Sequence, residues 1–147
     1  PKEIIAGMNK IQSQSNTSTS SISMAASVEA LEGNQDFIQL HNIEFKKRRD
    51  MVVDKLNSIE GITCTLPAGA FYVYPSCAGV LGKKSPDGEV IDNDEKFMNY
   101  LLESQGVAGV HGEAFGLSPY FRLSYATSEN ILKEACDRIS RACLNLR

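Results

Sequence analysis

The sequence predicts an α/β protein whose C-terminal part is a small α+β domain, a small open sheet with flanking helices. Three observations lead to this prediction. After Gly61, strand-like and helix-like segments follow one another in the order β-β-loop-α-β-β-α, which is typical of helices packed on a sheet. A helical pattern without a break covers residues 34–58, and the C-terminal segment repeats apolar side chains at helical spacing.

Length and composition describe one globular chain with room for a core. Of the 147 residues, 42% are hydrophobic and 22% are charged, so the chain can bury apolar surface and carries too little charge for disorder. Its 15 Lys and Arg are outnumbered by 18 Asp and Glu, which argues against a surface that neutralises nucleic-acid phosphates. No stretch has the apolarity of a signal peptide or a membrane span. We therefore expect a cytoplasmic protein that binds neither nucleic acid nor a membrane.

The cysteines and histidines do not form a metal-binding motif. Four cysteines lie far apart in the sequence: Cys64, Cys77, Cys136 and Cys143. Because no Cys-x-x-Cys pair is present, we interpret them as reduced, packed thiols. His111 and Glu113 have the His-x-Glu spacing of zinc deaminases, but the Pro-Cys-x-x-Cys string of those enzymes is missing. No metal site is therefore expected.

The N-terminal third is predicted to be helical. Apolar residues at helical spacing indicate a helix over residues 1–12. Residues 13–23 are mostly Ser and Thr, which favour turns and caps, so a loop that ends in a helix cap is expected there. Small apolar residues predict a second helix over residues 20–31, ended by Gly33. The third helix, at 34–58, is long enough to bridge two domains.

Four segments have the composition of strands. Residues 62–66 and 71–74 are β-branched or aromatic and flank the turn residues 67–69, so they predict a hairpin. Residues 107–111 and 120–125 predict two further strands.

Two helices are expected to pack on these strands. Residues 76–93 contain several glycines and prolines and predict a long loop, and the acidic cluster at 92–95 caps a helix that Gly106 ends. Thr127 or Ser128 caps the last helix, in which apolar residues recur at i, i+3 and i+4.

Arg122 is the residue with the clearest chemical signal. It lies inside an apolar strand, where alternation puts it on the same face as Tyr120 and Ser124. A guanidinium in such a strand costs free energy unless a carboxylate or a phosphate meets its planar fork. The residues alone leave two alternatives, a carboxylate-binding site or a structural arginine that forms an internal salt bridge or lies on an edge strand.

Seven stretches follow a pattern found in one enzyme family. In chain order they are 10–15 (KIQSQS), 28–31 (VEAL), 48–50 (RRD), 67–73 (PAGAFYV), 106–108 (GVA), 114–116 (AFG) and 121–128 (FRLSYATS). The glycine–aromatic hairpin followed by the Arg-Leu-Ser-Tyr-Ala strand is specific as a set. The chain resembles the C-terminal part of the pyridoxal-phosphate-dependent class I aminotransferases, and among them the bacterial enzymes that act on aspartate.

The resemblance implies a domain organisation and two site residues. Residues 1–40 would be a remnant of the large cofactor-binding domain, and residues 41–147 would be the C-terminal small domain, reached through the helix at 34–58. Arg122 would form a bidentate pair with the substrate's α-carboxylate. Phe71 would be an aromatic wall of the active site, with a core aromatic as an equal alternative. Residues 1–40 would then be exposed, swapped between chains or poorly anchored in this chain alone.

The resemblance also implies the chemistry. The family uses pyridoxal 5'-phosphate to move an amino group from an amino acid to a 2-oxo acid, here from aspartate to 2-oxoglutarate, and its members work as homodimers. Its catalytic lysine lies in a Ser-x-x-Lys string upstream of the position at which this chain starts, and no lysine here stands in that context. We therefore expect no catalytic residue and few cofactor ligands in this chain, and no activity of the chain alone.

Two alternatives stay open. Because a fold does not fix a reaction, the chain could be the small domain of another pyridoxal-phosphate enzyme, a lyase or a decarboxylase. It could instead be a non-catalytic binding module with the same fold. The sequence does not reveal the amino-acid specificity, because the resemblance implies that the residues recognising the substrate's side chain lie upstream or on the partner subunit.

Overall fold

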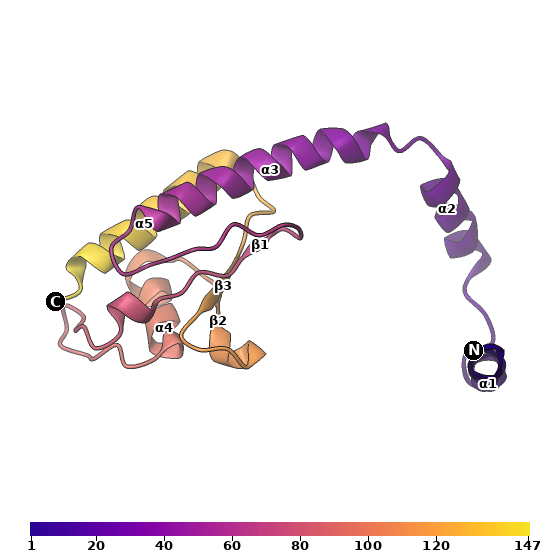
Figure 1. Ribbon diagram of the computed structural model, residues 1–147, viewed down its shortest axis with the longest axis horizontal. Coiled ribbons are helices and arrows are strands. Elements are labelled where there is room, and N and C mark those ends of the chain that lie inside the picture. The colour runs from indigo at the N-terminus through magenta and orange to yellow at the C-terminus, as the bar shows by residue number, and fades with distance from the viewer. The chain divides into compact units, whose positions relative to one another are not determined.

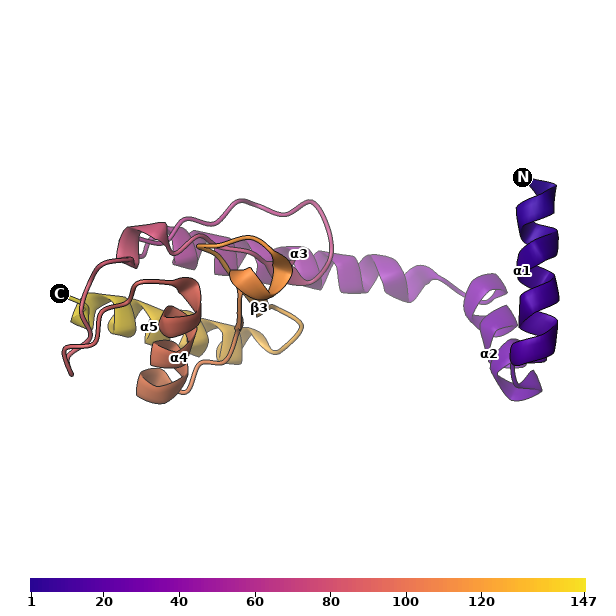
Figure 2. The same ribbon diagram turned by 90° about the horizontal axis from the view of Figure 1, so that it is seen from below.

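The computed structural model describes residues 1–147 as two units, Pro1–Leu40 and His41–Arg147 (Figures 1 and 2). None of the helices combines the length and the apolarity that crossing a membrane requires. That residues 1–40 belong to a large cofactor domain stays a prediction.

The first unit consists of helices with exposed side chains. Helix α1 spans Lys2–Ser15, helix α2 spans Ser21–Glu32, and every residue up to Leu40 except Gly33 is exposed, as expected. Helix α1 includes residues 13–15, for which the sequence predicted a loop. The hydroxyl of Ser13 donates a hydrogen bond to the carbonyl of Lys10 at 3.0 Å, which allows Ser13 to lie within the helix.

Helix α3 spans Asp36–Asn57, close to the predicted 34–58. The side-chain oxygen of Asn34 accepts a hydrogen bond from the Asp36 N–H at 2.6 Å, as a cap does. Val52, Val53 and Leu56 are buried, so the second half of this helix contributes to the core of the second unit.

The sheet has three short antiparallel strands in the order β1-β3-β2. They are β1 (Tyr72–Val73), β2 (Val110–His111) and β3 (Phe121–Ser124). The predicted small open sheet with flanking helices is confirmed, although each strand is shorter than the sequence suggested.

The predicted strand at residues 62–66 is wrong. Thr63 and Ser76 form only an isolated antiparallel bridge. The side-chain oxygen of Asn57 accepts the Cys64 N–H at 2.7 Å, and the Asn57 amide donates to the Cys64 carbonyl at 3.0 Å. Because a side chain satisfies both backbone groups of Cys64, the ladder does not continue there.

Helices α4 (Asp94–Gln105) and α5 (Glu129–Asn145) pack against each other in the second unit (Figure 2). The side chain of Asn93 caps α4 by accepting the Lys96 N–H at 2.8 Å, and Ser128 caps α5. Two 3₁₀ turns, Ala78–Val80 and Gly112–Phe115, lie in the loops. The core joins these helices to the sheet, as the rings of Phe97 and Phe121 show, with centroids 5.5 Å apart.

All four cysteines are buried and unpaired. Burial raises the pKa of the thiols of Cys64, Cys136 and Cys143 to about 11 and that of Cys77 to about 12. Such thiols stay protonated at neutral pH and are poor nucleophiles. The prediction of packed thiols is confirmed.

Ion pairs join α3 to α5, which lie side by side (Figure 1). Lys47 contacts Glu129 at 3.0 Å, and Lys55 contacts Asp137 at 2.6 Å. The second pair lies the same number of residues further along both helices, so the two helices run in parallel here. Glu129 also accepts from Lys133, and the hydrogen bonds from Lys133 and then Lys47 lower the pKa of the Glu129 carboxyl from 4.5 to about 2.

Replacing Glu129 with glutamine is expected to lower stability at neutral pH, and this loss should shrink as the pH falls and vanish below pH 2. A carboxyl whose pKa is lowered by folding stabilises the fold above its unfolded pKa, here about 4.5, and this contribution disappears as the pH falls through its folded pKa, about 2. Urea unfolding of the wild type and of Glu129→Gln between pH 2 and pH 7 measures the difference in the free energy of unfolding. This difference is small because the Glu129 carboxylate is partly exposed to solvent. The matched variant Glu103→Gln, on an exposed carboxylate without an ion pair, should show no difference at any pH. A Glu129→Gln deficit that persists unchanged at pH 2 would contradict this account.

Candidate functional site

Arg122 lies on the central strand of the sheet. Its partner across the β2–β3 pair is Val110, and the β1–β3 register puts Tyr72 opposite Ser124. Tyr72, Ser124 and Arg122 therefore share one face, while Phe121 is fully buried on the other. Arg122 is half-buried and does not lie on an edge strand.

Two aromatic rings enclose the guanidinium of Arg122. Its central carbon lies 4.6 Å from the ring centroid of Tyr72 and 4.5 Å from that of Phe115, within the range of cation–π attraction. No carboxylate forms an ion pair with Arg122, although seven other such pairs exist in the chain. The internal salt bridge and the edge strand therefore do not explain this arginine. Its planar fork is held by ring faces, which leaves the donor groups available for a planar anion.

Residues 112–120 form a closed loop that carries Phe115. The Gly112 N–H donates to the Tyr120 carbonyl at 2.7 Å and the Leu117 N–H donates to the Gly112 carbonyl at 3.1 Å. The ring of Tyr74 stacks on that of Tyr120, with centroids 5.5 Å apart, and the Tyr74 hydroxyl donates to the Gly112 carbonyl at 3.2 Å. These contacts fix the loop beside β3.

Gly112→Ala is expected to destabilise the chain by about 2 kcal/mol or more, since overpacking a tight site costs this much. A Cβ on Gly112 would lie 2.0 Å from the Leu117 carbonyl oxygen and 2.8 Å from that of Tyr120. Urea unfolding measures the loss. Gly69→Ala is the matched control, because nothing lies within 4 Å of its Cβ position. Equal unfolding midpoints for the two variants would show that the loop adapts freely.

The carboxylate of Asp94 meets the same loop from the first residue of α4. Its Oδ2 accepts the Glu113 N–H at 3.1 Å and the Tyr120 N–H at 3.4 Å. Asp94 is 1% exposed. The sequence predicted Asp94 only as part of a capping cluster, and it actually joins the start of α4 to the loop before β3.

Phe71 is half-exposed and lies beside the aromatic group at Arg122. Its ring centroid is 4.4 Å from that of Tyr72 and 6.5 Å from that of Phe45. The Phe71 carbonyl accepts the Tyr125 N–H at 2.9 Å, which fixes the backbone at this point. The core-aromatic alternative does not fit, since 43% of Phe71 is exposed. A role in binding substrate stays a prediction.

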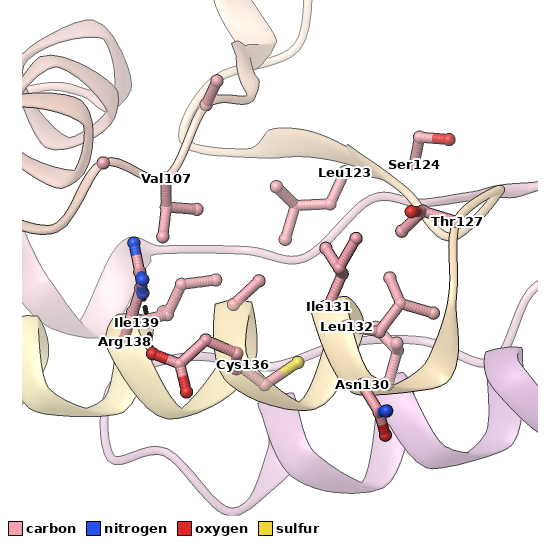
Figure 3. A pocket seen from close by; sticks show the side chains of 15 residues that line it. Val107, Leu123, Ser124, Thr127, Asn130, Ile131, Leu132, Cys136, Arg138 and Ile139 are labelled. Carbon is pink, nitrogen blue, oxygen red and sulfur yellow. Dashed lines mark hydrogen bonds and ion pairs between the residues drawn. The ribbon is translucent and has the colours of Figure 1, made fainter.

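One cavity of the second unit does not have Arg122 in its wall. It has a volume of about 550 Å³, and its wall is formed mainly by α5, residues 106–108 and Leu123 of β3 (Figure 3). Leu123 and Arg122 are on opposite faces of the strand. Arg138 in this cavity donates to Glu134 at 2.8 Å and to the Gln105 carbonyl at 3.0 Å. Because its arginine is already paired, this apolar cavity is a weaker candidate for an anion than Arg122.

A lysine that bonds to the aldehyde of the cofactor needs an amine with a lowered pKa. Lys47, Lys55 and Lys96 each donate to a carboxylate, and this hydrogen bond raises the pKa of each amine. These three therefore have the opposite of the required property. The site around Arg122 fits the carboxylate end of a substrate, because its guanidinium forms no ion pair.

Sequence reasoning did not identify Tyr72, Phe115 and Asp94 as site residues. Tyr72 could have been found from strand alternation, since the residue paired with Ser124 on the neighbouring strand shares the face of Arg122. Phe115 and Asp94 reach the site through a loop and a helix start, and no spacing rule in the sequence connects them to Arg122.

Comparison with known proteins decides the family. The family model described as aminotransferase class I and II matches residues 1–139. The chain belongs to this family. The predicted family, with the pyridoxal phosphate that it implies, is therefore confirmed.

Among the aminotransferases most similar to the chain is a protein of Rhizobium leguminosarum bv. phaseoli named "Probable aspartate/prephenate aminotransferase". It is 56% identical over 143 residues, which are 97% of this chain and 36% of that protein. The chain thus spans about a third of the length of the curated relatives it matches.

Two solved aminotransferase structures support the fold. The aspartate aminotransferase of Rhizobium meliloti has a TM-score of 0.96 and 54% identity, covering 100% of this chain and 37% of that one. The aspartate aminotransferase of Thermus thermophilus with maleate has a TM-score of 0.81 and 34% identity, covering 97% of this chain and 35% of that one.

Proposed function

We propose that the intact protein is an aspartate aminotransferase that moves the amino group of aspartate to 2-oxoglutarate, and that Arg122 binds the α-carboxylate of the substrate. The observation that carries the proposal is the guanidinium of Arg122, enclosed by Tyr72 and Phe115 and without an ion pair, in a chain of the aminotransferase family. The names of the relatives, which are aminotransferases, favour this reaction over that of a lyase or decarboxylase.

Arg122 has two tasks in this account. Its planar fork donates hydrogen bonds to both oxygens of a carboxylate, which fixes the rotation of the substrate as well as its position. The rings of Tyr72 and Phe115 limit the access of water to the guanidinium, so that its attraction for a carboxylate is stronger than in bulk solvent. The substrate's Cα is thereby held in one orientation.

The chemistry supplied by pyridoxal phosphate, when it is bound, is an electron-accepting ring for the Cα of the substrate. We propose that the lysine bonded to its aldehyde belongs to the part of the relatives that this chain does not match. The lysines of this chain that pair with carboxylates do not suit that role. The contribution of residues 1–147 is to bind and orient the substrate.

We also propose that residues 1–40 belong to the large cofactor domain, that residues 41–147 form the small domain, and that the intact protein is a cytoplasmic homodimer. Large apolar side chains along α1 and α2 are exposed, and an exposed apolar surface indicates an interface. Examples are Ile4, Met8, Ile11, Ile22 and Leu31. Sedimentation of the intact protein tests the dimer, and a monomer would contradict it.

The function is tested with the intact protein reconstituted with pyridoxal phosphate. Aspartate and 2-oxoglutarate are supplied together, and oxaloacetate and glutamate are measured. A parallel reaction with prephenate as acceptor is included because the name of one relative contains this substrate. Formation of the two products supports the proposal. Failure to transfer an amino group from any dicarboxylic or aromatic amino acid would end it, and release of carbon dioxide or ammonia instead would favour the decarboxylase or lyase alternative.

A further inference from the structure

Asp94 is the only charged side chain buried in the core of this chain. No lysine, arginine or histidine forms an ion pair with it. A buried carboxylate without a cation costs free energy unless hydrogen bonds compensate for lost water. Burying an apolar side chain at this position would cost less free energy than burying a carboxylate, so packing alone does not explain Asp94. The groups to which Asp94 is hydrogen-bonded indicate its role.

The groups bound by Asp94 are the two ends of the loop at residues 112–120. Its Oδ2 accepts from the N–H of Glu113 at one end and from the N–H of Tyr120 at the other. Its position as the first residue of α4 is favourable, because the start of a helix stabilises a negative charge. One carboxylate oxygen on a rigid helix therefore fixes both ends of the loop.

This loop determines how the guanidinium of Arg122 is held. Phe115 lies in the middle of the loop and provides one of the two rings that enclose the guanidinium. Tyr120, whose N–H Asp94 accepts, lies two residues before Arg122 on the same chain segment. A shift of the loop would move the Phe115 ring and the start of β3 together.

We infer that Asp94 is a positioning residue for the carboxylate site: it anchors the 112–120 loop and thereby sets the position of Phe115 against Arg122. The inference rests on the proposed function of Arg122. Asp94 itself does not touch the substrate in this account.

The test uses the intact enzyme with pyridoxal phosphate and measures the dissociation constant of maleate, a dicarboxylate that carries no amino group. Asp94→Ala should raise this constant about tenfold, the size of the coupling between residues that share contacts. Asp94→Asn keeps the size and an acceptor oxygen and should raise it about threefold, since a neutral acceptor is weaker than a charged one. If Asp94→Ala does not fold, the dissociation constant of maleate for Asp94→Asn still tests the inference. Asp92→Ala is the matched control, because Asp92 lies at the same helix start but is exposed and contacts Lys96.

A double-mutant cycle separates positioning from general stability. The loss caused by Asp94→Asn should disappear when Arg122 is already replaced by lysine, because the planar fork that the loop positions is then absent. An equal loss in both backgrounds, or maleate binding unchanged by Asp94→Asn and Asp94→Ala, would overturn the inference and leave the function of Arg122 in place. If Arg122→Lys alone does not weaken maleate binding, the proposed carboxylate site fails, and the role of Asp94 fails with it.

Discussion

Replacing Arg122 with alanine in the intact enzyme is expected to lower kcat/KM for aspartate about a hundredfold to a thousandfold, since removing one partner of a hydrogen-bonded charge pair costs about 3–4 kcal/mol. The loss should appear mainly as a higher KM. The content of bound pyridoxal phosphate, measured by its absorbance, should be nearly unchanged, because Arg122 is assigned to the substrate and not to the cofactor.

Two control variants define the reason for this loss. Arg122→Lys keeps the positive charge but lacks the planar fork, so it should recover only part of the activity. Arg141→Ala removes an arginine whose contact is an exposed pair with Glu134 at 3.4 Å, and it should behave like the wild type. Loss of bound cofactor from Arg122→Ala, or full activity of Arg122→Lys, would contradict the assigned role.

Phe97→Ala is expected to give the largest loss of stability, about 3–5 kcal/mol in the free energy of unfolding, as for other buried aromatic residues truncated to alanine. Phe97 is 0% exposed on α4, and its ring meets the edge of Phe121 at an interplanar angle of 68°. Truncation therefore removes apolar contact and an aromatic pair and leaves a cavity behind β3. Urea unfolding of the 147-residue chain measures the loss.

Leu102→Ala is the matched control for this variant. Leu102 lies on the same helix, but 53% of it is exposed, so its truncation should cost less than about 1 kcal/mol. Similar losses for Phe97→Ala and Leu102→Ala would mean that α4 does not pack on the sheet as described.

The helices of the second unit could be predicted because their signals are local. Apolar residues in α5 recur at the helical period, and buried Leu132, Cys136 and Ile139 lie on the predicted face. Caps mark the helix starts, and Gly106, with φ of +65°, ends α4 as predicted. These features depend on residues within a few positions of one another, so the sequence contains them.

The strand at 62–66 and the surroundings of Arg122 depend on contacts that are remote in sequence. β-branched composition suggested a strand, but the side chain of Asn57 satisfies the backbone of Cys64 instead. In the same way, strand alternation identified Arg122, while Phe115 and Asp94 join it only after the chain has folded. The local sequence pattern therefore predicts Arg122 as the residue that needs an anion, but it does not predict the residues that position Arg122.

The central claim, that Arg122 binds the substrate's carboxylate, is tested most directly by a crystal structure of the intact protein with pyridoxal phosphate and maleate. Two oxygens of one maleate carboxylate are predicted to accept hydrogen bonds from the Arg122 guanidinium at about 2.7–2.9 Å, with the rings of Tyr72 and Phe115 still on either side of it. Maleate bound elsewhere, with the Arg122 guanidinium in contact only with protein groups and water, would contradict the claim.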